Sequence, residues 1–89
     1  MNKYYIEMTD TFGGEANYCW VNRFTCEAKS MKAALTKVKQ DVYNFPAKVR
    51  HTTSDYGDML RADVKKDCVV FFVYEADEFN MQESNIMEL

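Results

Sequence analysis

Proline and glycine are scarce in this chain, which has one proline and three glycines among its 89 residues. This scarcity excludes a flexible linker, and the sequence contains no internal repeat and no low-complexity tract. A chain of this length corresponds to one domain. We therefore expect one fold with one hydrophobic core.

Residues that commonly carry chemistry are also few. His51 is the only histidine, and the cysteines Cys19, Cys26 and Cys68 form no C-x-x-C pair. An ordinary zinc site needs more ligands than these, and no nucleophile and base are recognisable as a motif. The sequence therefore predicts no catalysis, no metal and no cofactor, with the three thiols reduced.

The nearest approach to a metal-binding pattern is the set Asp55, Asp58 and Asp63. Loop carboxylates can bind Mg²⁺ or Ca²⁺, but the spacing is not that of an EF-hand. The segment 54–58, Ser-Asp-Tyr-Gly-Asp, is also typical of a turn, and we favour that interpretation. Gly13-Gly14 lacks the lysine and serine of a phosphate-binding loop and likewise predicts a turn.

Long apolar runs are missing too. The longest, Cys68–Tyr74, is far too short to cross a membrane. Lys3 is not followed by the apolar segment of a secretory leader. We therefore expect a soluble, cytoplasmic protein that makes no membrane contact.

Basic residues are absent from the last part of the chain. Residues 1–66 contain eleven Lys and Arg against eight Asp and Glu, a net charge of +3, whereas residues 67–89 contain six acids and no base. This division favours contact with a basic partner surface, although acidic ends also serve solubility alone. Glu75, Asp77 and Glu78 directly follow an expected strand, so they could present fixed charge to such a surface.

Aromatic residues, by contrast, are abundant, with six Tyr, six Phe and one Trp in a chain that is 47% hydrophobic. This composition is sufficient for a packed core without a disulfide or a metal. So small a core cannot enclose every ring, and surplus Tyr and Trp are common at contact surfaces. Tyr18 and Trp20 are the candidates for such a surface.

Two segments alternate between apolar and polar residues as half-buried strands do, residues 3–9 and residues 17–28. The apolar sets are Tyr4, Ile6 and Met8 in the first segment and Tyr18, Trp20, Phe24 and Cys26 in the second. Asn22 interrupts the second set, and either a bulge or a polar gap would fit there. Residues 10–16, which include Gly13-Gly14, form the predicted loop of an antiparallel hairpin.

A helix is predicted over residues 30–45, with Ser30 as the N-cap and Pro46 as the stop. Its apolar stripe comprises Met31, Ala34, Leu35, Val38, Val42 and Phe45. We expect this stripe to pack on a sheet through either Val69 and Phe71 or Val70 and Phe72.

Residues 47–53 are predicted as a short strand, residues 60–63 are compatible with an extended segment, and residues 68–74 form the best central strand. The order is ββαββ, which predicts an α+β two-layer sandwich. A small, mainly antiparallel sheet would carry the helix on one face and surplus aromatics on the other. Residues 1–79 form the predicted domain, and residues 80–89 a mobile acidic tail.

Nucleic-acid binding is an alternative. The basic residues on or beside the helix are Lys29, Lys32, Lys37, Lys39, Lys48 and Arg50. Arg23 lies among aromatic residues, and an aromatic sheet face can stack bases. Against this alternative, the isoelectric point is about 5.0, far below that of typical nucleic-acid-binding domains.

Two segments resemble small, uncharacterised proteins encoded by phages and prophages: residues 10–21, Asp-Thr-Phe-Gly-Gly-Glu-Ala-Asn-Tyr-Cys-Trp-Val, and residues 55–61, Asp-Tyr-Gly-Asp-Met-Leu-Arg. Arg23–Ala28, leading into a serine-capped helix that contains alanine, resembles the layout of small type I anti-CRISPR proteins. This resemblance implies an inhibitor that binds a CRISPR effector complex of the host. Such proteins share no diagnostic motif, so the resemblance assigns no functional residues.

Three functions are therefore considered. The first is a phage-type inhibitor that binds a host defence complex and blocks nucleic-acid access without catalysis. Its predicted partner-binding residues are Glu75, Asp77, Glu78, Tyr18, Trp20, Asp55, Tyr56 and Asp58. The second is a nucleic-acid-binding accessory protein that uses the lysine-flanked helix and the aromatic sheet face. The third, a small hydrolase or nuclease built on residues 55–63, has the least support.

Overall fold

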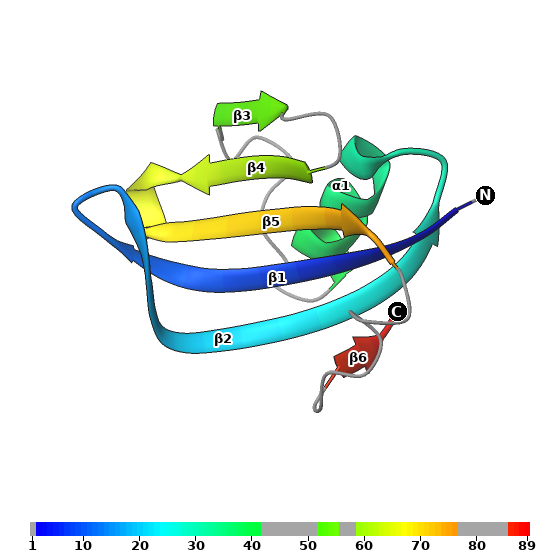
Figure 1. The fold of residues 1–89 in the computed structure, drawn as a ribbon, viewed down its shortest axis with the longest axis horizontal. Helices are drawn as coiled ribbons and strands as arrows, with labels where there is room; N and C mark the ends of the chain where they lie inside the picture. Colours follow the sequence, from blue (N-terminus) through cyan, green and yellow to red (C-terminus); the bar gives the residue numbers. More distant parts are fainter. Residues whose placement is uncertain (1, 42–51, 56–58, 77–85) are drawn as a thin grey trace.

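The computed structural model describes residues 2–41, 52–55, 59–76 and 86–89. The elements in chain order are β1 (Asn2–Phe12), β2 (Glu15–Ala28), α1 (Met31–Asp41), β3 (Thr52–Asp55), β4 (Met59–Val64), the 3₁₀ turn η1 (Lys65–Asp67), β5 (Val69–Glu75) and β6 (Ile86–Glu88). The strands form one six-stranded sheet in the order β3-β4-β5-β1-β2-β6, and α1 lies behind it in Figure 1.

Strand pairing is antiparallel throughout this sheet except between β2 and β6, which are parallel. The predicted α+β class, with a mainly antiparallel sheet and one helix on one face, is confirmed. The predicted central strand is confirmed as well, because β5 lies between β4 and β1. No helix in the described parts of the chain is long and apolar enough to span a membrane.

The element order differs from the predicted ββαββ arrangement. Residues 59–64 form a complete strand, β4, and Ile86–Glu88 forms β6 within the segment predicted as a mobile tail. Ser54 and Asp55 belong to β3, where they pair with Arg61 and Leu60, and not to a turn. The physical reason is that strand hydrogen bonds come from a neighbouring strand, which a short sequence pattern does not reveal. Residues 47–51 lie outside the described residues.

The helix begins as predicted. The Ser30 hydroxyl oxygen accepts a hydrogen bond from the Ala33 backbone N–H at 3.1 Å, which is an N-cap contact. The stripe then buries Leu35 and Val38 in the core and packs Met31 against it. The described helix ends at Asp41, and the last predicted stripe residues, Val42 and Phe45, lie outside the described residues, as does Pro46.

The core lies between α1 and one face of the sheet. Its sheet residues are Tyr4, Ile6, Met8, Phe24, Cys26, Ala28, Leu60, Ala62, Val64, Val69, Phe71 and Val73. Of the two packing alternatives, the helix therefore meets Val69 and Phe71 and not Val70 and Phe72. This parity directs Arg61 and Asp63, on β4, to the other face.

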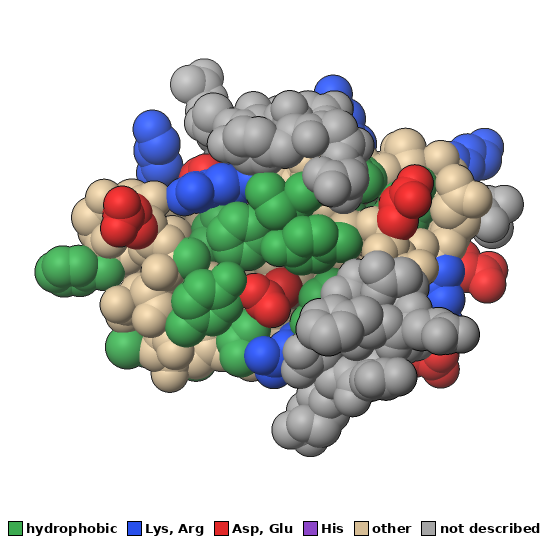
Figure 2. Space-filling model, in the orientation of Figure 1, with side chains coloured by type: hydrophobic (Ala, Val, Ile, Leu, Met, Phe, Trp, Pro, Cys, Tyr) green, Lys and Arg blue, Asp and Glu red, His purple; other side chains and the backbone are tan. Residues whose placement is uncertain are grey.

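The opposite face of the sheet, seen in Figure 2, carries no helix among the described residues. Three cross-strand rows cover it: Met59, Tyr74, Tyr5 and Thr25; Arg61, Phe72, Glu7 and Arg23; and Asp63, Val70, Thr9 and Val21. The predicted surplus aromatics are present, and the rings of Tyr5 and Tyr74 lie 6.1 Å apart. Tyr5 and Phe72 are nevertheless only 3% and 8% exposed, so this face is not an open aromatic platform.

Candidate partner-binding hairpin

The connection between β1 and β2 is a two-residue turn at Gly13 and Gly14. Their φ angles are +63° and +85°, a left-handed backbone that glycine adopts without steric cost. Phe12 and Glu15 pair directly across the turn. The loop predicted for residues 10–16 is therefore shorter, because both strands continue up to the glycines, as in the preferred hairpin turns.

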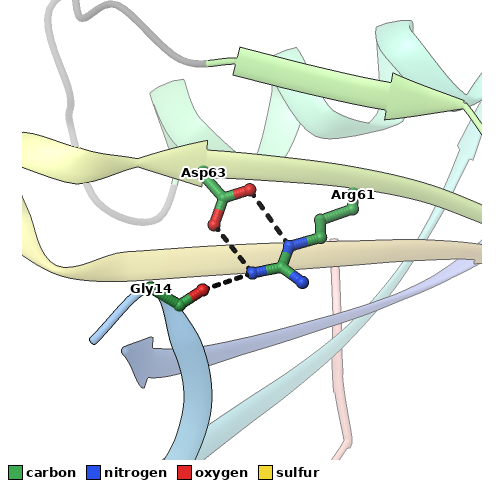
Figure 3. A network of polar contacts seen from close by, with 3 residues as sticks. All are labelled: Gly14, Arg61 and Asp63. Atoms are coloured by element: carbon green, nitrogen blue, oxygen red, sulfur yellow. Dashed lines mark hydrogen bonds and ion pairs between the residues drawn. The ribbon is translucent and has the colours of Figure 1, made fainter. Parts of the chain in front are cut away.

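The turn is attached to β4 through Arg61 (Figure 3). Arg61 Nη2 donates to the Gly14 carbonyl oxygen at 2.8 Å, and the guanidinium also binds both Asp63 carboxylate oxygens, at 3.0 and 3.1 Å. The guanidinium carbon lies 5.7 Å from the Phe72 ring centroid. Because β5 separates β4 from β1, these contacts hold the turn across the end of β5. The end of the hairpin is thus fixed to the rest of the sheet.

A bulge interrupts the hairpin just before this turn. Thr9 pairs with Val21 and Thr11 pairs with Ala16, so Asp10 alone faces residues 17–20. Of the two alternatives at Asn22, the bulge is wrong, because Asn22 pairs regularly with Met8. That prediction assumed that apolar and polar residues alternate without a break over residues 17–28. The additional residues of the bulge change which face of the sheet the residues before Val21 point to, so this assumption fails.

Asp10 organises the bulge. One carboxylate oxygen accepts the Cys19 backbone N–H at 2.8 Å, and the other accepts Asn17 Nδ2 at 2.9 Å. The Thr9 hydroxyl donates to the Trp20 carbonyl oxygen at 2.6 Å. The hydrogen bond from Asn17, and after it those from the backbone, hold the pKa of Asp10 below its ordinary value. The Cys19 N–H and the Trp20 carbonyl, which lie within the bulge, are therefore hydrogen-bonded to side chains of β1.

Tyr18 is the residue of the bulge with a left-handed backbone. Its φ of +53° is rare for a residue other than glycine. Its hydroxyl donates to Glu7 Oε1 at 2.8 Å, and Arg23 Nε lies 3.9 Å from the second Glu7 oxygen. Burial first, and then the Glu7 carboxylate, raises the pKa of Tyr18 to about 12. The hydroxyl is thus a permanent hydrogen-bond donor at neutral pH.

Most of the exposed large hydrophobic side chains in the described residues belong to this hairpin. Phe12, Tyr18 and Trp20 are 80%, 53% and 41% exposed, and the one other large apolar side chain exposed among the described residues is Met87. Residues 4–22 contain the acids Glu7, Asp10 and Glu15 and no lysine or arginine. We call Phe12, Glu15, Tyr18 and Trp20 the hairpin surface.

The structure brings together only some of the predicted partner-binding residues. Tyr18 and Trp20 lie in the bulge, whereas Glu75 is exposed at the end of β5 and pairs with Tyr4. Tyr4 and Phe12 are eight residues apart on β1, about 26 Å of extended strand. Glu75 therefore lies at the other end of β1 from Phe12 and Glu15 at the hairpin tip.

The other predicted site residues contribute less to this site. Asp77, Glu78, Tyr56 and Asp58 lie outside the described residues, and Asp55 is placed only as the last residue of β3. Asp63 is engaged by Arg61. Within the described parts of the chain, no three His, Cys, Asp or Glu side chains gather as a metal site would require.

Two described features bear on the nucleic-acid alternative. Glu7 lies in the middle row of the sheet face opposite α1, where its carboxylate would repel phosphate. The neighbouring Phe72 is buried and therefore offers no exposed ring on which a base could stack. On the helix, Lys39 is only 6% exposed, and burial lowers the pKa of its ammonium group. The helix therefore does not present a full row of solvated lysines.

Sequence reasoning selected Tyr18 and Trp20 by their aromatic character but missed Phe12, Glu15 and Glu7. The signal for the first two was present, since Phe-Gly-Gly-Glu at residues 12–15 is the pattern of a two-residue hairpin turn. That pattern puts Phe12 and Glu15 opposite each other at the tip. Glu7 had no local signal, because its partners come from β2.

No family model matches this chain, and neither a curated protein nor a solved structure matches it. The function is therefore argued from the chemistry of the hairpin surface.

Proposed function

We propose that this protein is a non-catalytic binding protein whose hairpin surface docks on a lysine- and arginine-lined surface of a partner protein. The observation that carries the proposal is the concentration of exposed Phe12, Tyr18 and Trp20 in a segment with three acids and no base. Aromatic residues supply most of the energy in many protein interfaces. Complementary charge speeds the encounter and excludes partners of the wrong sign.

The rigidity of the hairpin supports this proposal. Asp10 fixes the bulge, and Arg61 fixes the turn to β4. A surface that is ordered before binding loses less conformational entropy on association. Tyr18 retains a strained backbone within this framework, and such strain is concentrated at functional sites.

The most concrete partner is the nucleic-acid groove of a CRISPR effector complex in the host cytoplasm. Such a groove is lined with basic residues, because its ligand is a polyanion. An acidic, aromatic hairpin in that groove would compete with nucleic acid. The resemblance of residues 10–21 to phage-encoded proteins and the overall −3 charge support this assignment.

The test is inhibition of target-DNA binding by a purified type I effector complex, measured by gel shift with increasing amounts of this protein. We expect the wild-type protein to prevent the shift. The double variant Phe12→Ala/Trp20→Ala should lose most of this inhibition, because both side chains are exposed and belong to the hairpin surface.

Met87→Ala is the matched control, since Met87 is 54% exposed but belongs to β6. Circular dichroism would establish that each variant is folded. Unchanged DNA binding at saturating wild-type protein would reject the inhibitor function. Equal inhibition by the double variant would reject the hairpin surface as the contact.

A further inference from the structure

We infer that the hairpin surface selects arginine over lysine in its partner, with the guanidinium stacked on Phe12 and paired with Glu15. The inference rests on the proposed function and specifies the side chain that is recognised.

The geometry at the hairpin tip carries this inference. Phe12 and Glu15 are directly opposed residues that flank the two-residue turn. Directly opposed side chains lie on one face, with Cβ atoms roughly 4.5–5.5 Å apart. Phe12 is 80% exposed and Glu15 is also exposed. A planar cation resting on the ring therefore has the carboxylate within reach of its N–H groups.

The fold already contains an arginine held in this way. The Arg61 guanidinium lies 5.7 Å from the Phe72 ring centroid and makes two hydrogen bonds to Asp63. The Arg61 guanidinium is thus held by an aromatic ring and a carboxylate. Phe12 and Glu15 present the same two groups to solvent. A second arginine, Arg23, lies 3.9 Å from Glu7, whose carboxylate binds the Tyr18 hydroxyl.

Arginine fits this pair better than lysine for physical reasons. A guanidinium is flat, loses less hydration when it stacks, and can donate to both oxygens of a carboxylate. An ammonium group is compact, strongly hydrated and cannot lie flat on a ring. Cation–π contacts accordingly involve arginine more often than lysine.

A second copy of this chain is a poorer occupant than a foreign arginine. The two arginines within the described residues, Arg61 and Arg23, are already engaged with carboxylates of their own sheet. Two hairpins brought together would also place two segments that contain acids and no base side by side, and like charges repel.

The experiment uses Trp20, the only tryptophan of the chain, as a fluorescent reporter. Hexaarginine and hexalysine peptides are titrated into the full-length protein at low and at physiological salt. We expect hexaarginine to bind about two- to fivefold more tightly than hexalysine, the range of ratios that one exposed cation–π contact provides. Because both peptides carry the same charge, the non-specific electrostatic contribution to binding cancels in the ratio of their dissociation constants.

Two variants test the named residues. Phe12→Leu keeps an apolar side chain but removes the ring, and Glu15→Gln keeps the shape but removes the charge. Each should reduce the arginine-to-lysine ratio toward one. Met87→Leu and Glu27→Gln are the matched controls, because both residues are exposed outside the hairpin surface, and these variants should leave the ratio unchanged.

Equal affinity for the two peptides, or no binding of either, overturns the inference. The effector assay with Phe12→Ala/Trp20→Ala then still decides the proposed function independently. Light scattering of the protein without peptide completes the test. Dimerisation that Phe12→Leu abolishes would assign the surface to a second copy and would also overturn the inference.

Discussion

At the scale of single residues, Tyr18 shows most clearly why the hairpin differs from an ordinary strand pair. A left-handed backbone costs a residue with a side chain roughly 1–2 kcal/mol. Tyr18 adopts it, and the contacts of Asp10, Asn17 and Thr9 with the bulge surround it. Sequence reasoning could select this tyrosine as aromatic, but its conformation depends on hydrogen bonds from β1 that no local pattern reveals.

Tyr18 should ionise well above an ordinary tyrosine. Its pKa is raised from 10.0 to about 12, first by burial and then by Glu7. Because the pKa is raised on folding, the protonated Tyr18 hydroxyl and its hydrogen bond to Glu7 stabilise the fold fully below pH 10. This stabilisation is lost as the pH rises toward about 12. Ultraviolet titration of wild type and Tyr18→Phe isolates this residue. Glu7→Gln should lower the pKa of Tyr18, and an unchanged value would exclude Glu7 as a cause.

Asp10 should make the bulge sensitive to acid. Its pKa is lowered mainly by the Asn17 hydrogen bond, so the stabilisation is present above the ordinary aspartate pKa and is lost as pH falls through the lowered value. Hydrogen exchange of the Cys19 amide, which donates to Asp10, measures the effect. Asp10→Ala should remove the protection at neutral pH, whereas Asp10→Asn should retain part of it. Full protection in Asp10→Ala would contradict the assigned role.

At the scale of elements, the sequence predicted those whose burial follows a simple period. Tyr4, Ile6 and Met8 face the core as the alternation of β1 requires, and Leu35 and Val38 do so on α1. The missed elements depend on partners distant in the chain. β6 pairs with β2 through three residues only, and nothing in the sequence of residues 86–88 specifies that strand.

Removing the Leu35 side chain tests the packing of α1. Leu35 is 2% exposed in the core between helix and sheet, so Leu35→Ala should lower the free energy of unfolding by about 2–5 kcal/mol. Gln40→Ala, at an exposed position of the same helix, should change it by less than about 0.5 kcal/mol. Denaturant titration measures both values. A Leu35→Ala cost as small as that of Gln40→Ala would show that this face of α1 is not packed.

The end of η1 provides a test of backbone strain. Cys68 has a φ of +53°, its backbone N–H donates to the Lys65 carbonyl, and its own carbonyl accepts from Thr11. The side chain is exposed, so substitutions act mainly through the backbone. The free energy of unfolding of Cys68→Gly should be about 1–2 kcal/mol larger than that of Cys68→Val, because only glycine adopts this φ without steric cost. Equal stabilities in denaturant titration would contradict this.

At the scale of the whole molecule, charge and aromatic surface are arranged along β1. The tip of the hairpin, with Phe12 and Glu15, lies at one end of the strand, and Glu75 pairs with Tyr4 near the other. Glu75 and the hairpin tip are separated by about 26 Å along the strand, which exceeds the Debye length of roughly 10 Å at 0.1 M salt. The two regions should therefore act on a partner independently, and their effects on binding should add.

This arrangement predicts a kinetic division between the two ends. Glu75→Lys should slow association with the basic partner at low salt, because it changes only the long-range field, and the effect should vanish at high salt. Phe12→Ala should instead speed dissociation at both salt concentrations, because it removes a side chain from the contact itself. Surface plasmon resonance against the effector complex separates the two rate constants, with Glu27→Lys as a control of equal charge change. If Glu75→Lys alters dissociation at high salt as strongly as Phe12→Ala does, Glu75 is part of the contact, and the binding surface extends along the whole length of β1.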